Sequence, residues 1–298
     1  MWTNLLQQIQ TGDERAIARG ISLIENEVPG FDSFLRSLPL SDCPVTGITG
    51  PPGAGKSTLV DALLSEMVQH GKKVAVLCVD PSSPFNLGAL LGDRIRMSEW
   101  YNNPNVFIRS LATRGSLGGL HPKIIEITEF LKAAAFDHII VETVGVGQSE
   151  IEVAGLADTT VVVLVPEAGD EVQTMKAGLM EIADIFVVNK SDRPEAGLFL
   201  KNLRSMLAPA FNNAHKEIQV LSTVASQKKG IAELWQAIEN NATSTGVTPR
   251  KTWLQTERAW QLIQQKRMKD LSKVVLQQRI TEKMKTGTFN LYEFVANL

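Results

Sequence analysis

The fold class predicted by the sequence is α/β, with a mostly parallel sheet covered by helices on both faces and helical extensions at both ends. Seven short runs rich in β-branched residues are bounded by turn residues, and helix-like stretches lie between most of them. Runs that are apolar on both faces and alternate with helices are typical of a parallel sheet buried on both sides. The expected strands are 45–49, 73–79, 105–110, 138–143, 159–165, 184–189 and 218–223, and the expected helices between them include 56–70, 121–135, 171–182 and 195–207.

The chain divides into three parts where its pattern changes. Residues 1–40 carry apolar positions at helical spacing, which predicts a helical N-terminal extension. Residues 41–242 contain the strands and end in a helix over 230–240, while the polar segment 241–250, with Gly and Pro, is typical of a linker. Residues 243–298 return to helical character as a C-terminal arm. So short an arm has little core of its own, so we expect its apolar face to pack on the main domain or on a second copy, which makes it a candidate for homodimerisation.

The composition of the chain indicates which kinds of binding partner and which cellular location to expect. With 298 residues, 44% of them hydrophobic, the chain can bury a large core. The formal charge of −2 comes from interspersed acidic and basic residues, so we expect no nucleic-acid or anionic-membrane binding. Cys43 and Cys78 show no paired spacing that would predict a disulfide or zinc site. The first residues lack the apolar core of a signal peptide, and no run approaches the ~18 apolar residues of a membrane span. We therefore expect a cytoplasmic protein.

A phosphate-binding loop is predicted directly after the first expected strand. The sequence GPPGAGKST matches Gly-x-x-x-x-Gly-Lys-Ser and begins a helix, as in P-loop NTPases. Its glycines allow the backbone to wrap around a phosphate, and the helix adds its positive N-terminal end; the alternative is a glycine-rich turn that binds nothing. We expect Lys56 to neutralise the β- and γ-phosphates and the Ser57 hydroxyl to coordinate Mg²⁺. The expected nucleotide-binding residues here are Gly50, Pro51, Pro52, Gly53, Ala54, Gly55, Lys56, Ser57 and Thr58.

The base is predicted from the sequence NKSD at the end of the expected strand 184–189. A loop at this end of a strand faces the ligand in an open α/β sheet. The Asp192 carboxylate can accept hydrogen bonds from guanine N1–H and the 2-amino group, which adenine cannot supply in that arrangement. ATP would leave this carboxylate unpaired, so we expect Asn189, Lys190 and Asp192 to bind GTP and its product GDP.

Three carboxylates are candidates for the metal side of the site. The expected strand ending at 142 delivers Glu142 to the phosphate region, where it can hold Mg²⁺, and the N–H of Gly145 can face the γ-phosphate; alternatively Glu142 only caps the next turn. Asp80 ends the second expected strand, and Asp93 lies in a Gly-flanked segment suited to a nucleotide-sensing switch. We expect Ser57 and these three carboxylates to hold Mg²⁺, with Glu142 and Asp93 acting beside Lys56 in catalysis. Two arginines, Arg109 and Arg114, could also approach phosphate.

Five stretches together resemble the MeaB/ArgK GTPases, the methylmalonyl-CoA mutase-associated members of the metal- and cofactor-chaperone group of SIMIBI P-loop GTPases. These are GITGPPGAGKSTLVDAL, VDPSSPFNLGALLGDRIRM, FIRSLATRGSLGGL, IIVETVGVGQSE and VVVLVPEAGDEVQTMKAGLMEIADIFVVNKSDRP, within about residues 44–230. The group carries Glu in place of Asp in its third motif. The resemblance implies a P-loop GTPase domain, a dimerising C-terminal arm, and a role with an adenosylcobalamin-dependent acyl-CoA mutase in which GTP hydrolysis gates cofactor loading and protects or reactivates the mutase. We expect no cobalamin to bind this chain directly.

One motif departs from the family pattern. Where the family has Thr-Ser-Ala in its fifth motif, this chain has STVAS, with Val224 at the Ser position. Thr223, Val224 and Ala225 are still expected beside the base, with the Ala225 N–H on the guanine carbonyl oxygen. Two alternatives remain open from the motifs: a GTP- or ATP-dependent kinase of a transport protein, and a metallochaperone GTPase, which the lack of a His-rich tract or Cys-x-x-Cys disfavours.

Overall fold

The computed structural model describes residues 1–80, 97–113, 120–143, 145, 149–168, 182–213, 218–242, 249–268, 270–271, 273–287 and 289–298. The contacts of the chain form two compact units, Met1–Leu254 and Gln255–Leu298. Of the expected helices, 171–182 lies outside the described residues except for its last position.

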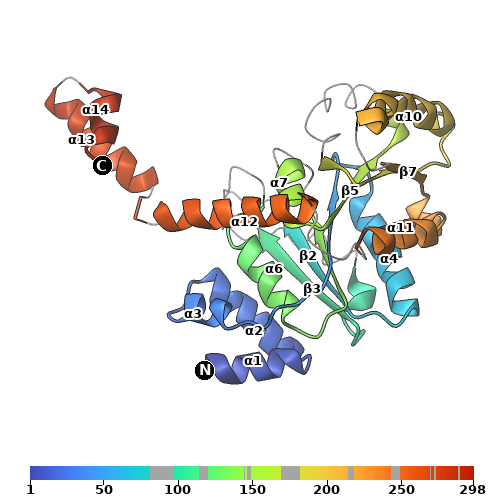
Figure 1. Ribbon diagram of the computed structural model, residues 1–298, viewed down its shortest axis with the longest axis horizontal. Helices are drawn as coiled ribbons and strands as arrows, with labels where there is room; N and C mark the ends of the chain where they lie inside the picture. The colour runs from blue at the N-terminus through green and yellow to red at the C-terminus, as the bar shows by residue number, and fades with distance from the viewer. Residues whose placement is uncertain are drawn as a thin grey trace. The chain divides into compact units, whose positions relative to one another are not determined.

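The first unit is built on a seven-stranded sheet in the order β3-β2-β4-β1-β5-β6-β7 (Figure 1). Each pair of neighbouring strands runs parallel, so the predicted fold class is confirmed. Every expected strand is present, with ends that differ by at most two residues. The strands are β1 (Val45–Thr49), β2 (Val74–Asp80), β3 (Val106–Ala112), β4 (His138–Glu142), β5 (Thr159–Leu164), β6 (Ile185–Val188) and β7 (Gln219–Ser222).

Helices cover both faces of this sheet because its central strands are apolar on both sides. Alternate residues of β2 belong to different cores: Val76 and Cys78 to one, Leu77 and Val79 to the other. The first core includes residues of α4 (Lys56–Gln69), α10 (Ala196–Asn213) and α11 (Ile231–Ala242), and the second includes residues of α6 (Ile124–Lys132) and most of the buried residues of α7 (Ser149–Leu156).

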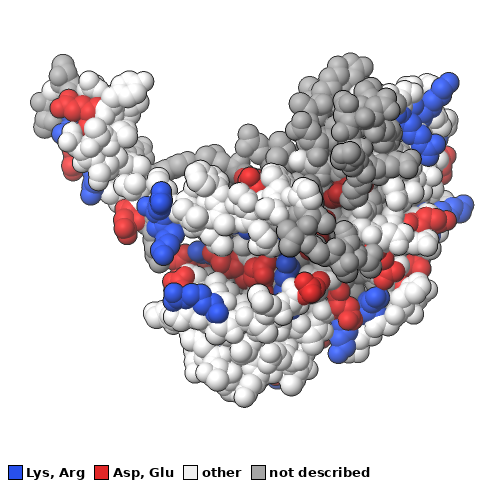
Figure 2. Space-filling model, viewed as in Figure 1, with Lys and Arg blue, Asp and Glu red and all other residues white. Residues whose placement is uncertain are grey.

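The N-terminal extension is helical and shares the second core. Its helices are α1 (Trp2–Gln10), α2 (Glu14–Glu25) and α3 (Phe31–Arg36). Ile17 and Ile21 of α2 are fully buried in the same cluster as Phe130 of α6. Asp13 caps α2 by accepting the N–H of Ala16 at 3.0 Å. The exposed residues of α1 are uncharged, and the surface over α1 is largely uncharged in the view of Figure 2.

Three aspartates tie the amino ends of neighbouring strands together. Each lies directly before a strand, and its carboxylate accepts the backbone N–H at or next to the start of the adjacent strand. The carboxylate thus supplies an acceptor for a backbone N–H at the end of the sheet's hydrogen-bond ladder. The pairs are Asp137 with Lys73 (2.7 Å), Asp158 with Val45 (2.9 Å) and Asp184 with Thr160 (2.8 Å). These bonds join three of the six neighbouring strand pairs at the amino edge, and the loops of the predicted site lie at the opposite, carboxyl edge.

The second unit is helical. It contains most of α12 (Pro249–Arg267), with α13 (Lys273–Thr286) and α14 (Leu291–Ala296). Large apolar side chains are exposed on it, including Trp260, Ile263 and Val274. Among the described residues, none of the helices has the length and apolar character needed to cross a membrane.

Candidate functional site

The predicted phosphate loop connects the carboxyl end of β1 to α4, in the middle of the sheet. Gly50 has φ +140°, and a Cβ on it would lie 2.1 Å from the Val163 carbonyl oxygen of β5, so a side chain cannot be accommodated there. The Lys56 ammonium donates to the carbonyl oxygens of Gly50 at 2.9 Å and Pro51 at 3.1 Å, and its residue is 6% exposed. The lysine therefore already lies within the loop.

The structure brings Ser57, Glu142 and Gly145 to the same loop. Glu142 ends β4, which pairs with β1 so that Ile48 faces Glu142. The Ser57 hydroxyl donates to Glu142 Oε1 at 2.7 Å, and Glu142 is 4% exposed. A Cβ on Gly145 would lie 2.4 Å from both the Gly50 oxygen and the Lys56 ammonium, so the chain after Glu142 passes directly over the loop.

Of the two other carboxylates predicted for the metal, only Asp80 lies within the described residues; Asp93 lies outside them. Asp80 ends β2 on the far side of β4, two residues beyond Cys78, which pairs with Glu142. It is buried, with 5% of the residue exposed. Ser57, Glu142 and Asp80 therefore supply oxygen atoms from three neighbouring elements at one edge of the sheet.

A pair of threonines that the motifs did not single out joins the strand ends that carry this site. Thr143, directly after Glu142, donates its hydroxyl to the hydroxyl of Thr49 at 3.0 Å, and its N–H bonds to the Ile48 oxygen at 3.0 Å. Both threonines are buried. The only sequence signal was the position of each, immediately beside Glu142 or Gly50.

The predicted base-binding segments meet the phosphate loop through Asn189. Its amide nitrogen donates to the Ala54 oxygen at 2.9 Å, and its amide oxygen accepts from the Thr223 hydroxyl and the Ala225 N–H, both at 3.1 Å. Asn189 is 2% exposed. One buried side chain thus holds together the phosphate loop, the end of β6 and the loop after β7.

The remaining residues predicted for the base lie around Asn189. The Lys190 ammonium donates to the Gly53 oxygen at 2.8 Å, and its backbone is left-handed, with φ +55°. Asp192 is exposed. Val224 is buried, and its N–H bonds to the Lys229 oxygen at 3.1 Å, which closes the turn around Ala225. The Ala225 N–H expected on guanine is engaged by Asn189 in this structure.

A family model described as "Methylmalonyl Co-A mutase-associated GTPase MeaB" matches residues 17–280. The chain belongs to this family. A protein of Pyrococcus abyssi is 49% identical over 246 residues, 81% of this chain and 76% of its own. The Escherichia coli GTPase ArgK is 36% identical over 244 residues, 78% of this chain and 73% of its own. The crystal structure of a LAO/AO transport system kinase superposes with a TM-score of 0.68 at 27% identity, covering 99% of this chain and 95% of the other.

The resemblance to the MeaB/ArgK GTPases is therefore confirmed, and this MeaB-family protein is a GTPase that binds and hydrolyses GTP. Its carboxyl-edge oxygens fit Mg²⁺, which prefers hard carboxylate and hydroxyl ligands beside phosphate. Its loop amides and Lys56 fit phosphate oxygens.

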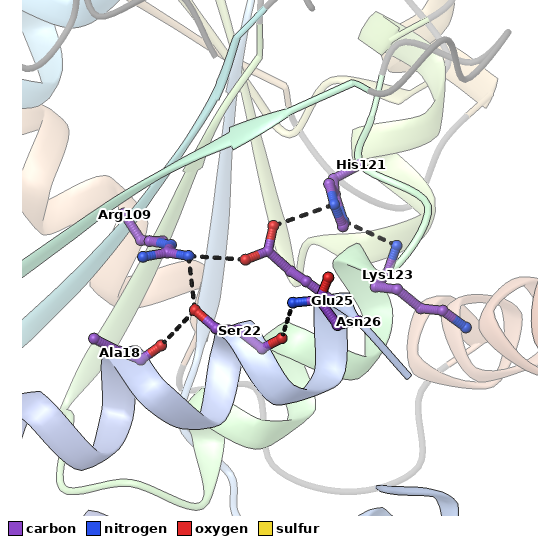
Figure 3. Close-up of polar contacts among 7 residues, drawn as sticks. All are labelled: Ala18, Ser22, Glu25, Asn26, Arg109, His121 and Lys123. Atoms are coloured by element: carbon purple, nitrogen blue, oxygen red, sulfur yellow. Dashed lines mark hydrogen bonds and ion pairs between the residues drawn. The ribbon is translucent and has the colours of Figure 1, made fainter. Parts of the chain in front are cut away.

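Of the two arginines predicted to approach phosphate, Arg109 is engaged elsewhere and Arg114 lies outside the described residues. Arg109 lies on β3 and bonds to Glu25 and Ser22 of α2 (Figure 3). The motifs had no means to show this, because a single arginine carries no information about a partner more than eighty positions away.

Proposed function

We propose that this MeaB-family GTPase is a cytoplasmic, Mg²⁺-dependent chaperone of an adenosylcobalamin-dependent acyl-CoA mutase of the methylmalonyl-CoA mutase type. GTP hydrolysis gates cofactor loading and protects or reactivates the mutase. The observation that carries the proposal is the match of residues 17–280 to a family described as mutase-associated. The cobalamin belongs to the mutase in this proposal, and the chain itself holds only GTP or GDP and Mg²⁺.

Hydrolysis depends on positioning and charge neutralisation in this proposal. The Lys56 ammonium exchanges the two carbonyl oxygens of its own loop for phosphate oxygens, which accept stronger, charge-assisted hydrogen bonds. Ser57, Asp80 and Glu142 are the described residues that would hold Mg²⁺, which when bound neutralises phosphate charge. Gly145 offers its N–H to the γ-phosphate because no side chain separates it from Lys56.

Guanine selection rests chiefly on Asp192 in this proposal. Its carboxylate is exposed and available to N1–H and the 2-amino group, whereas the Ala225 N–H already donates to Asn189. Asn189 and Lys190 support the base-binding segment by donating hydrogen bonds to carbonyl oxygens of the phosphate loop. GTP should therefore be preferred strongly over ATP, and Asp192→Asn should remove much of that preference.

The chain is a homodimer in this proposal, assembled through the C-terminal arm. The arm exposes large apolar side chains such as Trp260 and Ile263, which are 57% and 44% exposed. Burial of apolar side chains between two copies stabilises a dimer. Sedimentation of the wild type and of Trp260→Glu tests this part: a dimer that becomes a monomer supports it, and a wild-type monomer contradicts it.

Binding to the mutase is tested by immobilising the chain with GDP or with a non-hydrolysable GTP analogue and adding host extract. Recovery of a cobalamin-dependent mutase, identified by mass spectrometry and reproduced with the purified mutase, supports the proposal. Absence of any such mutase in both nucleotide states contradicts it. The Lys56→Ala protein serves as a control for nucleotide dependence, because it should no longer respond to the analogue.

The alternative activity, a kinase, is favoured by one observation, the similarity to the LAO/AO transport system kinase. GTP labelled at the γ-position separates the two. Label recovered only as inorganic phosphate supports hydrolysis, and label found on a protein or small molecule supports the kinase.

A further inference from the structure

Glu25, the last residue of α2, joins the N-terminal extension to two segments of the GTPase domain (Figure 3). Its Oε2 accepts from Arg109 Nη2 at 2.8 Å, and its Oε1 lies 3.5 Å from His121 Nε2. The Glu25 side chain is 10% exposed and that of Arg109 is 25% exposed. A pair so shielded is screened less by solvent and salt than a surface ion pair.

Arg109 lies on β3, which ends the sheet formed by the described strands and pairs there with β2. It faces Leu77 of β2, and three residues later Ala112 faces Asp80. The Thr113 N–H then bonds to the Asp80 carbonyl oxygen at 3.0 Å. Phe107 and Leu111, two positions before and after Arg109, lie in the second core, and on this face of the sheet Arg109 Nη2 also donates to the Ser22 hydroxyl at 3.2 Å. The strand that accompanies Asp80 is therefore held along its length by β2 and, at its middle residue Arg109, by α2 on one face.

His121, in the segment just before α6, contacts the same Glu25 carboxylate. Its Nδ1 accepts the Lys123 N–H at 3.0 Å, so the proton of the neutral ring is on Nε2 and faces Glu25. The His121 side chain is 1% exposed and lies just before α6. One carboxylate therefore contacts a residue of β3 and a residue just before α6.

We propose that Glu25 is a positioning residue for GTP hydrolysis, which holds the middle of β3 through Arg109 and thereby fixes the strand that pairs with Asp80, a proposed Mg²⁺ ligand. The N-terminal extension then supports the metal side of the site without touching nucleotide. The inference rests on the proposed role of Asp80 as a metal ligand. Residues that hydrogen-bond directly to a metal ligand change metal affinity by about 10- to 100-fold when they are replaced, and because Glu25 acts through Arg109 and β3, we expect an effect at the lower end of this range.

The test compares Glu25→Gln with wild type and with Glu27→Gln, a control from the same segment whose more exposed carboxylate pairs with Lys123. GTP hydrolysis is measured across a Mg²⁺ titration, GDP affinity is measured in EDTA, and the unfolding midpoint is measured in urea. We expect Glu25→Gln to raise the half-saturating Mg²⁺ concentration by about tenfold, with GDP affinity in EDTA within about twofold of wild type. Glu27→Gln should match wild type in both.

A fall in the unfolding midpoint with unchanged Mg²⁺ dependence would show that Glu25 only stabilises the fold, and would overturn the inference. Asp80→Asn separates this from failure of the proposed function. If Asp80→Asn leaves Mg²⁺ dependence unchanged, the metal role of Asp80 and the inference both fail; if it alters that dependence while Glu25→Gln does not, only the inference fails. Should Glu25→Gln not fold, Arg109→Lys carries the test, since an ammonium cannot reproduce the guanidinium fork, with an expected rise of about threefold.

Discussion

Replacing Asn189 with alanine should both destabilise the protein and weaken nucleotide binding. The change removes the donor to the Ala54 oxygen and the acceptor of the Thr223 hydroxyl and the Ala225 N–H. The residues that carry these three groups are at most 5% exposed, so water cannot readily replace the lost partner. A buried polar group left unsatisfied costs about 1–3 kcal/mol, so we expect a loss of roughly 3–5 kcal/mol in the free energy of unfolding after partial relaxation.

The measurement is urea unfolding of the nucleotide-free protein, followed by tryptophan fluorescence, with the midpoint and slope compared between variants. Asp192→Asn is the matched control, because this exposed side chain belongs to the same loop. Its stability should stay within about 0.5 kcal/mol of wild type. GDP affinity should fall about 10- to 100-fold in Asn189→Ala, since the phosphate loop and the loop after β7 lose their shared support.

A second substitution, Thr223→Val, tests the single hydrogen bond between Thr223 and Asn189. Thr223→Val removes the hydroxyl that Asn189→Ala leaves without an acceptor. The double variant should therefore be more stable than the sum of the single effects predicts, by about 1 kcal/mol. Strictly additive losses, or a loss below about 1 kcal/mol in Asn189→Ala alone, would refute the view that this side chain joins the three segments.

Three further predictions concern other parts of the molecule. Glu142→Gln should lower GTP turnover by about 10- to 100-fold, because a neutral amide is a poorer Mg²⁺ ligand; a turnover equal to wild type in a Mg²⁺ titration would count against the metal role. Gly50→Ala should abolish nucleotide binding measured by calorimetry, because its Cβ would lie 2.1 Å from the Val163 oxygen; retained binding would contradict this. Burial, with a smaller contribution from Lys72, lowers the pKa of His138 from 6.5 to about 3, so the folded ring stays neutral while the unfolded one gains a proton below pH 6.5. The free energy of unfolding should therefore fall by about 2 kcal/mol between pH 7.5 and pH 5 because of His138. Urea unfolding at the two pH values should show that this contribution is lost in His138→Asn and kept in His70→Asn, whose side chain is exposed.

The strands of this fold could be predicted from the sequence, because a strand that is buried on both faces is a short, continuous run of apolar and β-branched residues. β6 is wholly apolar, and β5 consists of two β-branched threonines followed by four apolar residues, so their type and approximate limits could be predicted. The phosphate loop and the NKSD segment could be predicted in the same way, since each is a short motif with a fixed spacing of residue types. Glu142 followed from its place at the end of a strand.

The contacts that hold the site together could not be predicted, because they depend on strand order. Asn189 reaches Ala54, 135 positions earlier, and only the adjacency of β1, β5 and β6 makes that possible. Thr143 meets Thr49 because β4 inserts between β1 and β2. Glu25 and Arg109 are each ordinary charged residues in the sequence, and their pairing requires α2 to pack beside the edge strand. Such long-range pairs have no periodicity or spacing that a single sequence displays.

The two supports of the nucleotide site lie on opposite sides of β1. Asn189 ties the phosphate loop to β6 and the loop after β7, the side that carries the predicted base-binding segments. Glu25 holds β3, beside β2 and Asp80, on the side that carries the carboxylates proposed for Mg²⁺. Since the two supports share no contact among the described residues, their effects should add when both are altered. Guanine selection should then depend on the β6 side alone and Mg²⁺ dependence on the β3 side, so Glu25→Gln should alter hydrolysis while leaving the nucleotide bound.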